Sequence, residues 1–238
     1  MKGTQMKIAA VYIDEFNLND ELFRLSMDVI SEERAHRVEK LHFAEDKIRS
    51  ILGELLVRIN LNENWGIENR YIQFEFNEFG KPQLKNHPQL HFNISHSGRW
   101  VVAVIDKCPI GLDVEQMKPI DLGIAERFFA PTEKQYILCQ PPERSLTGFY
   151  QIWTLKESYI KAVGRGLSIP LDSFSFELTK DRIFLSDSTS EEEWFFKIYE
   201  DLSGYVLAIC SAQPNITDKV YRFSLAELQS KIIQLYDE

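Results

Sequence analysis

The chain has 238 residues, of which 44% are hydrophobic and 12% aromatic, enough apolar side chains for one large or two small packed domains. Its net charge of −9 excludes general nucleic-acid binding, because that function needs a basic surface to displace counterions from phosphates. The cysteines are far apart and lack CxxC spacing, so we expect neither a disulfide framework nor a zinc site. No apolar run has the length of a membrane span, and the first residues do not resemble a secretory signal. We therefore expect a cytoplasmic protein without membrane or nucleic-acid partners.

A basic cluster lies early in this acidic chain, at Arg34, His36, Arg37, Lys40, His42, Lys47 and Arg49. Such a cluster is able to hold a small polyanion even when the whole protein is acidic. Glutamate and aspartate residues interleave with these basic residues, however, and that pattern is equally typical of a solvated helix face. Charge patterning alone leaves both interpretations open.

The chain also contains a weak internal repeat. A helical pattern at residues 46–59 recurs at residues 149–162, a lag of roughly 100 residues. In each half, an alternating strand pattern and then two strands around a Ser-Gly turn follow the helix; these strands are predicted at residues 71–76, 91–95 and 100–105, and at 174–178, 194–199 and 205–210.

The repeat predicts an α+β fold of two pseudo-symmetric halves, each a long helix packed on a small antiparallel sheet. A doubly wound parallel sheet is disfavoured because strands and helices do not alternate regularly. We place the boundary next to Pro109, which gives an N-terminal half of residues 1–109 and a C-terminal half of residues 110–238. A cleft between two such halves is a natural place for the active site.

Two polar turns are candidates for phosphate binding. In the segment 93–99, Ser95 and His96 offer side-chain donors, and Gly98 permits a positive φ, so backbone amides are able to form an anion nest. An ordinary hairpin turn has the same residue types. Gly80-Lys81-Pro82 is a short turn with one cation, and by itself it fits a plain β-turn.

Three carboxylates and one ammonium stand at spacings that suit metal and phosphate chemistry. Asp113 and Glu115 are two apart in an extended run, so both project from one face of a strand. Glu157 and Lys161 are four apart on a predicted helix, one turn above each other. Taken separately, each pair is more typical of a solvated surface. If the helix crosses the strand, the carboxylates converge into a site for a hard divalent cation that keeps positions open for water and phosphate.

Four sequence blocks occur in order with consistent spacing: Phe79–Pro82, Phe92–Trp100, Ile110–Glu115 and Trp153–Lys161. Together they resemble the 4′-phosphopantetheinyl transferases, in particular the type that activates surfactin synthetase and other peptide synthetases. The likeness continues through residues 127–129 and 166–174 and covers nearly the whole chain. It implies transfer of 4′-phosphopantetheine from coenzyme A to a serine of an apo peptidyl or acyl carrier domain. Magnesium, or manganese in its place, would assist, and adenosine 3′,5′-bisphosphate would be released.

The resemblance also implies roles for individual residues. Asp113, Glu115 and Glu157 would bind the metal, and Glu157 would also act as the base for the carrier serine, directly or through water. Lys161 and Arg37 would contact the pyrophosphate of coenzyme A. Four further residues would hold the phosphates of the coenzyme, including its 3′-phosphate: Arg34, Ser50, Ser95 and His96. Gly80, Lys81 and Pro82 would line the adenine end.

The carrier domain would dock on the excursion between Pro119 and Pro142, and the candidate contacts there are Ile120, Leu122, Phe128 and Phe129. Packing in the core is an equally good interpretation of these apolar residues. We expect a monomer, since both halves of the site belong to one chain. The competing functions are a non-catalytic coenzyme A-binding docking module and a metal-dependent phosphohydrolase that uses water instead of serine. The docking module would be expected to have lost an acidic position or the lysine, and all four are present.

Overall fold

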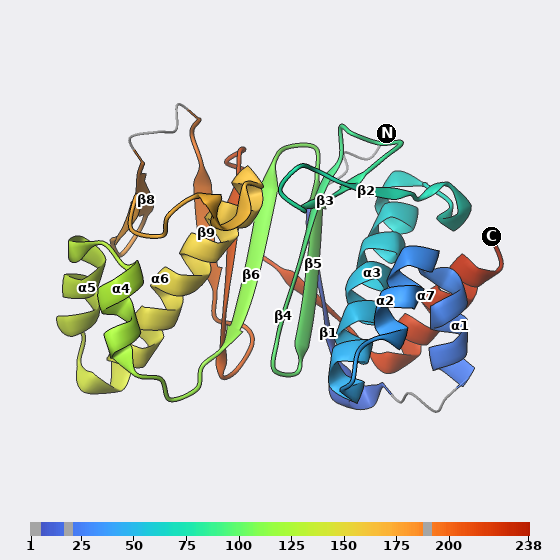
Figure 1. Cartoon of the computed structure of the whole chain (residues 1–238), viewed down its shortest axis with the longest axis horizontal. Helices are drawn as coiled ribbons and strands as arrows, with labels where there is room; N and C mark the ends of the chain where they lie inside the picture. Colours follow the sequence, from blue (N-terminus) through green and yellow to red (C-terminus); the bar gives the residue numbers. More distant parts are fainter. Residues whose placement is uncertain (1–5, 17–20, 188–191) are drawn as a thin grey trace. The chain divides into compact units, whose positions relative to one another are not determined.

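The computed structural model describes residues 6–16, 21–187 and 192–238, which form two compact α+β units. Unit 1 comprises Met1–Asn77, Pro82–Lys107 and Thr217–Glu238, and unit 2 comprises Glu78–Lys81 and Cys108–Ile216. Each unit contains one long helix on an antiparallel or mixed sheet (Figure 1). The α+β fold with two similar halves is therefore confirmed.

Unit 1 is built on a sheet with the strand order β11-β1-β5-β4. Its strands are β1 (Lys7–Tyr12), β4 (His91–Ser97), β5 (Trp100–Asp106) and β11 (Val220–Phe223). β5 pairs antiparallel with both β4 and β1, whereas β11 pairs parallel with β1. The β4–β5 turn contains Gly98 at a φ of 53°, which suits glycine because it has no Cβ.

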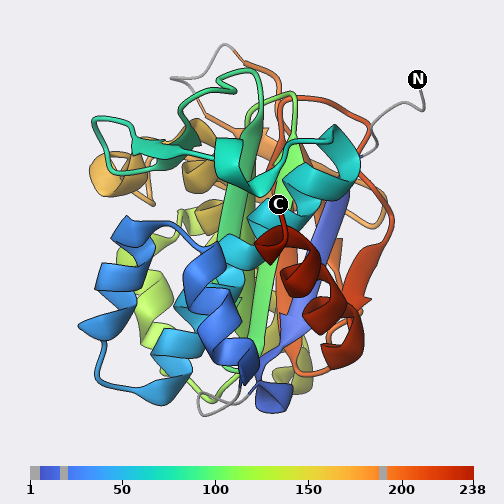
Figure 2. The same ribbon diagram turned by 90° about the vertical axis from the view of Figure 1, so that its right-hand side faces the viewer.

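Four helices cover one face of this sheet (Figure 1, Figure 2): α1 (Glu21–Val29), α2 (Glu32–Glu39), α3 (Ala44–Trp65) and α7 (Leu225–Tyr236). α3 lies closest, because a Cβ added at Gly53 would come within 2.9 Å of Ile94 on β4. The unit is completed by η1 (Ile13–Glu15), η2 (Asn69–Tyr71) and the hairpin of β2 (Phe74–Phe76) and β3 (Pro82–Leu84).

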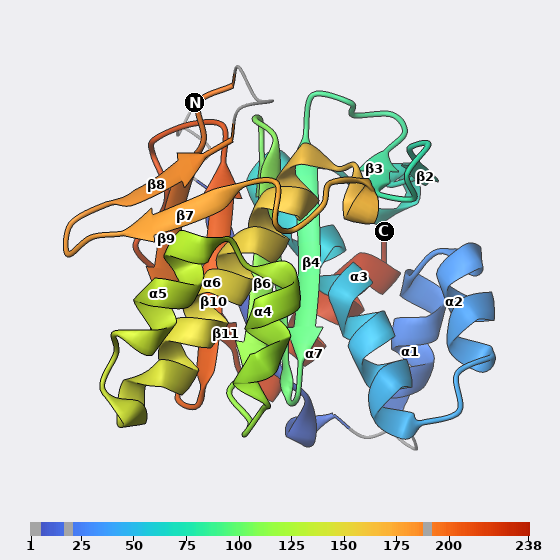
Figure 3. The same cartoon turned by 60° about the vertical axis from the view of Figure 1, so that its left-hand side comes forward.

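Unit 2 is built on the sheet β6-β10-β9, whose strands are β6 (Ile110–Gln116), β9 (Phe195–Tyr199) and β10 (Tyr205–Ser211). The long helix α6 (Pro142–Val163) packs on β6 and β10 (Figure 3). The remaining elements are η3 (Leu122–Ile124), α4 (Ala125–Phe128), α5 (Pro131–Leu138), η4 (Gly166–Ser168), β7 (Ser175–Leu178) and β8 (Ile183–Ser186). α5 and β7 also pack on α6, so this helix contacts elements other than the strands of its sheet.

The two long helices correspond closely. α3 and α6 each have 22 residues, and each ends at a glycine in the left-handed region, Gly66 at a φ of 65° and Gly164 at 78°. Glycine is the usual residue at this C-terminal position because it has no Cβ to clash. Neither of these helices, nor any other in the described ranges, is long and apolar enough to cross a membrane.

The end of the chain differs from the predicted division at residue 109. β11 pairs with β1, and α7 buries Leu228, Ile232 and Leu235 in the core of unit 1. Residues 217–238 thus complete the first unit, although the sequence pattern placed them in the C-terminal half. The reason is that periodicity identifies a strand but not the sheet edge with which its backbone pairs. Residues 78–81 cluster with unit 2, where Lys81 Nζ donates to backbone carbonyl oxygens of Ile110 and Ala162.

Candidate active site

Close packing of β6 on α6 sets the positions of the predicted acidic residues in unit 2. A Cβ added at Gly111 would lie 1.9 Å from the carbonyl oxygen of Ser158 and 2.4 Å from the amide nitrogen of Ala162. Only glycine permits this approach of strand to helix backbone. Gly111 therefore brings the carboxylates that follow it on β6 beside the charged face of α6.

The structure brings the four predicted residues together. Asp113 is buried, and its Oδ1 accepts a hydrogen bond from Lys161 Nζ on α6 at 2.5 Å. Glu115 follows two residues later on β6, so it shares the strand face of Asp113. Burial raises the pKa of Glu157; the negative charges of Asp113 and Glu115 raise it further, while the ammonium of Lys161 lowers it. Glu157 thus lies within electrostatic reach of all three neighbours.

The carboxylates are not arranged around a ready-made metal site. Within residues 6–16, 21–187 and 192–238, no three acidic, histidine or cysteine side chains stand close enough to hold a metal ion as they are placed. The Lys161 ammonium lies against Asp113 and partly compensates the negative charge of the group. The donor set itself, three carboxylates on a strand and a helix, fits a hard divalent cation, which prefers oxygen ligands.

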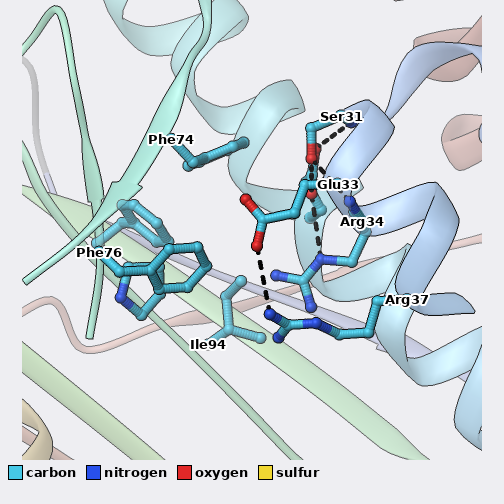
Figure 4. A pocket seen from close by; sticks show the side chains of 10 residues that line it. Ser31, Glu33, Arg34, Arg37, Phe74, Phe76 and Ile94 are labelled. Atoms are coloured by element: carbon cyan, nitrogen blue, oxygen red, sulfur yellow. Dashed lines mark hydrogen bonds and ion pairs between the residues drawn. The ribbon is translucent and has the colours of Figure 1, made fainter. Parts of the chain in front are cut away.

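A second candidate site is a small pocket in unit 1, in which Arg34 and Arg37 on α2 lie opposite Phe74 and Phe76 on β2 (Figure 4). Its lining comprises Ser31, Glu33, Arg34, Arg37, Glu54, Phe74, Phe76, Pro82, Phe92 and Ile94. The volume is about 20 Å³. This is enough for a water molecule but not for an adenine ring, so a larger ligand would lie over the mouth of the pocket.

The two predicted phosphate-binding arginines are held differently. Arg34 Nε donates to Glu54 Oε2 at 3.2 Å, and its Nη1 donates to Ser50 Oγ at 3.4 Å, so Arg34 and Ser50 are in contact. Arg37 pairs with Glu33 at 3.4 Å on the helix surface and lies over the ring of Phe76, 5.8 Å from its centroid. Arg34 therefore has a fixed environment, whereas Arg37 makes an exposed contact of the kind that exchanges readily.

Ser95 and His96 lie on opposite faces of β4, because successive side chains alternate along a strand. His96 is exposed and shares the face of Phe92 and Ile94, which line the pocket. Ser95 is buried and points to the other face. The phosphate-binding roles of Ser95 and His96 stay predictions, and the two side chains would contact coenzyme A from different faces of β4.

The turn predicted at the adenine end is divided between the units. Pro82 lines the pocket of unit 1, while Gly80 forms the turn at a φ of 83°. Lys81 Nζ instead donates to the carbonyl oxygens of Ala162 at 3.1 Å and Ile110 at 3.4 Å in unit 2. A cation at the carboxyl end of α6 is favourable for the helix dipole. Burial lowers the pKa of Lys81 to about 8.

Comparisons with known proteins identify the family of the chain. Residues 109–210 match a model of the 4′-phosphopantetheinyl transferase superfamily, and residues 15–107 match a model of the 4′-phosphopantetheinyl transferase N-terminal region. The 4′-phosphopantetheinyl transferase Sfp of Bacillus subtilis (strain 168) is 39% identical over 94% of this chain and 100% of its own length. The transferase psf-1 of Bacillus pumilus is 36% identical over 95% of this chain and 99% of its own. The chain belongs to the 4′-phosphopantetheinyl transferase family.

Membership assigns the enzyme class and agrees with the resemblance noted in the sequence. A 4′-phosphopantetheinyl transferase acts on carrier proteins. A solved holo-(acyl-carrier-protein) synthase from Bacillus anthracis has a TM-score of 0.40 and 19% identity, covering 44% of this chain and 94% of that one.

In this transferase, the predicted carrier-docking residues are only partly available. Phe129 is 2% exposed and stacks on Phe149 with ring centroids 5.3 Å apart, so its assignment to a docking surface is wrong: it belongs to the core. Ile120 and Leu122 are partly buried and pack against the same core. Phe128 is 38% exposed and keeps an accessible ring face. Sequence reasoning missed Leu138 at the end of α5, which is 77% exposed.

Sequence reasoning also missed two buried ionic networks in the transferase. In unit 1, Glu54 pairs with Arg58 at 2.7 Å, and in unit 2, Lys156 pairs with Glu133 at 2.9 Å. Each of these helices has charged residues within a buried stretch: Glu54 and Arg58 on α3, and Lys156 on α6. The residues before and after them in the sequence are mostly buried and apolar. A charged residue on the apolar face of a predicted helix was the available signal, because it is rarely buried without a partner.

Proposed function

We propose that this transferase moves 4′-phosphopantetheine from coenzyme A to a serine of an apo peptidyl or acyl carrier domain, with magnesium, and releases adenosine 3′,5′-bisphosphate. Carriers of non-ribosomal peptide synthetases are the expected targets, so the enzyme would act in antibiotic or related peptide biosynthesis. The observation that supports this most is the group of Asp113, Glu115, Glu157 and Lys161 on β6 and α6. We propose further that the enzyme works as a cytoplasmic monomer.

Asp113, Glu115 and Glu157 would hold the Mg²⁺, or Mn²⁺ in its place. A divalent ion bound there would offset the negative charge that develops on the phosphate oxygens. Lys161 lies beside Asp113 and, with Arg37, would contribute positive charge to the pyrophosphate of coenzyme A. No side chain needs to form a covalent intermediate in this arrangement.

Glu157 would take the proton of the carrier serine, since a hydroxyl is a weak nucleophile until a base within hydrogen-bond reach removes its proton. The serine oxygen then attacks the β-phosphorus of coenzyme A, and the bond from that phosphorus to the bridging oxygen breaks. Adenosine 3′,5′-bisphosphate leaves with the bridging oxygen. The proton reaches Glu157 directly or through a water molecule.

The pocket of unit 1 would bind the nucleotide end of coenzyme A. Arg34, Ser50 and His96 supply donors for its phosphates, and the exposed ring of Phe76 is available to stack on adenine next to Pro82. Gly80 turns the chain before Pro82, Lys81 donates to backbone carbonyl oxygens of Ile110 and Ala162, and Ser95 would reach coenzyme A from the other face of β4.

Carrier docking would rest on local apolar contacts of Phe128, Ile120 and Leu122. Long-range attraction is weak if the carrier is acidic, because the transferase itself carries a net charge of −9.

The test measures transfer to an apo carrier by mass spectrometry, with coenzyme A and Mg²⁺, for the wild type, Asp113→Ala and Glu157→Gln. The wild type should convert the carrier, and Asp113→Ala should retain less than about one-tenth of the activity because the site loses an oxygen ligand. Glu157→Gln keeps an oxygen but is not a base, so single-turnover transfer should fall roughly 10²- to 10⁴-fold while coenzyme A binding survives.

Other outcomes would contradict specific parts of the proposal. Coenzyme A hydrolysis without a carrier would indicate a phosphohydrolase, and binding with neither hydrolysis nor transfer would indicate a docking module. A folded Asp113→Ala variant with full activity would remove the metal assignment. A loss of coenzyme A affinity in Glu157→Gln that equals the loss of rate would make Glu157 a ligand only.

A further inference from the structure

Glu54 lies on α3 beneath the pocket of unit 1, and its side chain is almost fully buried, at 2% exposure. A buried carboxylate is costly unless it is paired and hydrogen-bonded. Glu54 meets that requirement through three residues, Ser31, Arg34 and Arg58. Because one of these, Arg34, is a proposed phosphate contact, the network has a consequence for the ligand.

The two oxygens of Glu54 have different partners. Oε1 accepts from the Ser31 amide at 2.6 Å and from Arg58 Nε at 2.8 Å. Oε2 accepts from the Ser31 hydroxyl at 3.0 Å and from Arg34 Nε at 3.2 Å. Ser31 is also the N-cap of α2, so the carboxylate fixes both the start of this helix and the arginine one turn into it.

The two guanidinium groups on Glu54 differ in what else they contact. Arg58 is 4% exposed, its Nη1 donates to Asn69 Oδ1 at 2.7 Å, and it lies over the ring of Phe74. Arg34 is 21% exposed and uses Nε on Glu54. Its Nη1 donates to Ser50 Oγ, and its side chain lines the pocket (Figure 4). Glu54 is therefore shared by one enclosed cation and one that reaches the pocket.

The charges of the three groups do not balance. Two guanidinium groups and one carboxylate leave one positive charge uncompensated among the three groups. Since Arg58 is enclosed, the excess charge is presented at Arg34. Without Arg58, the carboxylate would neutralise Arg34 and reduce its attraction for a phosphate. The Nε bond also orients the planar guanidinium, and an oriented fork is what bidentate phosphate recognition requires.

We propose that Glu54 is a positioning residue that sets the selectivity of the transferase for the phosphate of coenzyme A held by Arg34, with Arg58 as its counter-ion. The inference rests on the proposed phosphate-binding role of Arg34. Glu54 itself does not contact the ligand; it acts through the orientation of Arg34, while Arg58 keeps the carboxylate from neutralising Arg34.

The test compares the affinities of coenzyme A and dephospho-coenzyme A by calorimetry in Glu54→Gln and in the matched control Glu33→Gln. Both substitutions remove one negative charge from the lining of the same pocket, but Glu33 is 61% exposed and pairs with Arg37 instead of Arg34. Glu54→Gln should lower the preference for coenzyme A roughly tenfold, because Arg34 loses its fixed orientation. Glu33→Gln should change the affinities of both ligands by the same factor, because its partner Arg37 is proposed to contact the pyrophosphate that both ligands carry, and the preference should stay at the wild-type value.

A second variant separates positioning from folding. Glu54→Gln leaves Arg58 buried without a counter-ion, which by itself is destabilising. The double variant Glu54→Gln/Arg58→Gln removes both charges, so it should regain most of the stability and still lack the preference for coenzyme A.

Each outcome bears on the proposal. A folded double variant with wild-type preference would overturn it, as would equal changes in Glu54→Gln and Glu33→Gln. If wild-type protein has no preference for coenzyme A over dephospho-coenzyme A, the phosphate role of Arg34 fails and takes this inference with it. If the wild type has the preference and all variants keep it, only the role of Glu54 fails.

Discussion

Each unit buries a carboxylate against a cation on its long helix, but the two networks end differently. In unit 2, Lys156 is fully enclosed: it pairs with Glu133 at 2.9 Å and donates to the carbonyl oxygens of Leu171 at 2.7 Å and Phe174 at 2.8 Å. Glu133 accepts further bonds from backbone amides. In unit 1, the Glu54 network ends at Arg34, which is partly exposed in a pocket.

The difference separates a structural from a functional use of buried charge. The Lys156 network joins α5, α6 and the segment before β7, and all its partners belong to the protein. Burial raises the pKa of Glu133 and lowers that of Lys156, while their mutual attraction opposes both shifts. The Glu54 network instead leaves one uncompensated charge at Arg34, which lines a pocket. We call the Lys156 network closed, because all its partners lie within the protein, and the Glu54 network open, because it ends at a pocket. Substitutions in the closed network should change stability, and substitutions in the open network should change ligand binding.

The largest effect should come from breaking the closed network. Lys156→Met leaves Glu133 buried without its cation, so the free energy of unfolding should fall by about 3–5 kcal/mol in a urea titration. The double variant Glu133→Gln/Lys156→Met should recover most of this loss, since no charge remains unpaired. If Lys156→Met lowers the free energy of unfolding by less than about 1 kcal/mol, Glu133 does not depend on Lys156 as its buried counter-ion.

The open network should show the opposite pattern. Arg34→Ala should lower the unfolding free energy by less than about 1.5 kcal/mol, because Glu54 keeps Arg58 and Ser31. Its coenzyme A affinity should fall roughly 10- to 100-fold, the expected effect of losing a charged hydrogen-bond donor. Calorimetry with dephospho-coenzyme A provides the comparison. Equal losses for the two ligands would show that Arg34 does not hold the 3′-phosphate.

The smallest effect concerns Lys81, a third buried cation that is bonded to backbone carbonyls. Its pKa in the folded state is about 8, below the ordinary value of 10.5. Between these values the unfolded chain binds the proton and the folded chain does not, so the contribution of Lys81 to stability should rise with pH in this window.

Measured as the wild-type unfolding free energy minus that of Lys81→Met, the rise from pH 7.5 to 10 should be on the order of 1–3 kcal/mol. The subtraction removes the titration of other groups. A difference that stays constant or falls with pH would show that burial does not depress the pKa of Lys81.

Much of the fold and site could be predicted from the sequence, because the relevant signals are local. The repeat located α3 and α6, and alternation located β4, β5, β9 and β10. The spacings of Asp113 with Glu115 and of Glu157 with Lys161 fixed which side chains share a face. The opposite faces of Ser95 and His96 were also predictable from alternation along the strand.

Only the tertiary structure decided which distant surfaces meet. It joined β11 to β1, buried Phe129 against Phe149, directed Lys81 to the end of α6 and enclosed Glu54 with Arg58. Sequence spacing determines side-chain direction within one element through the helical and strand periods. Which strand edge an element pairs with, and which core or carbonyl oxygen its side chains contact, depends on packing between elements far apart in the chain. Local sequence periodicity does not determine this packing.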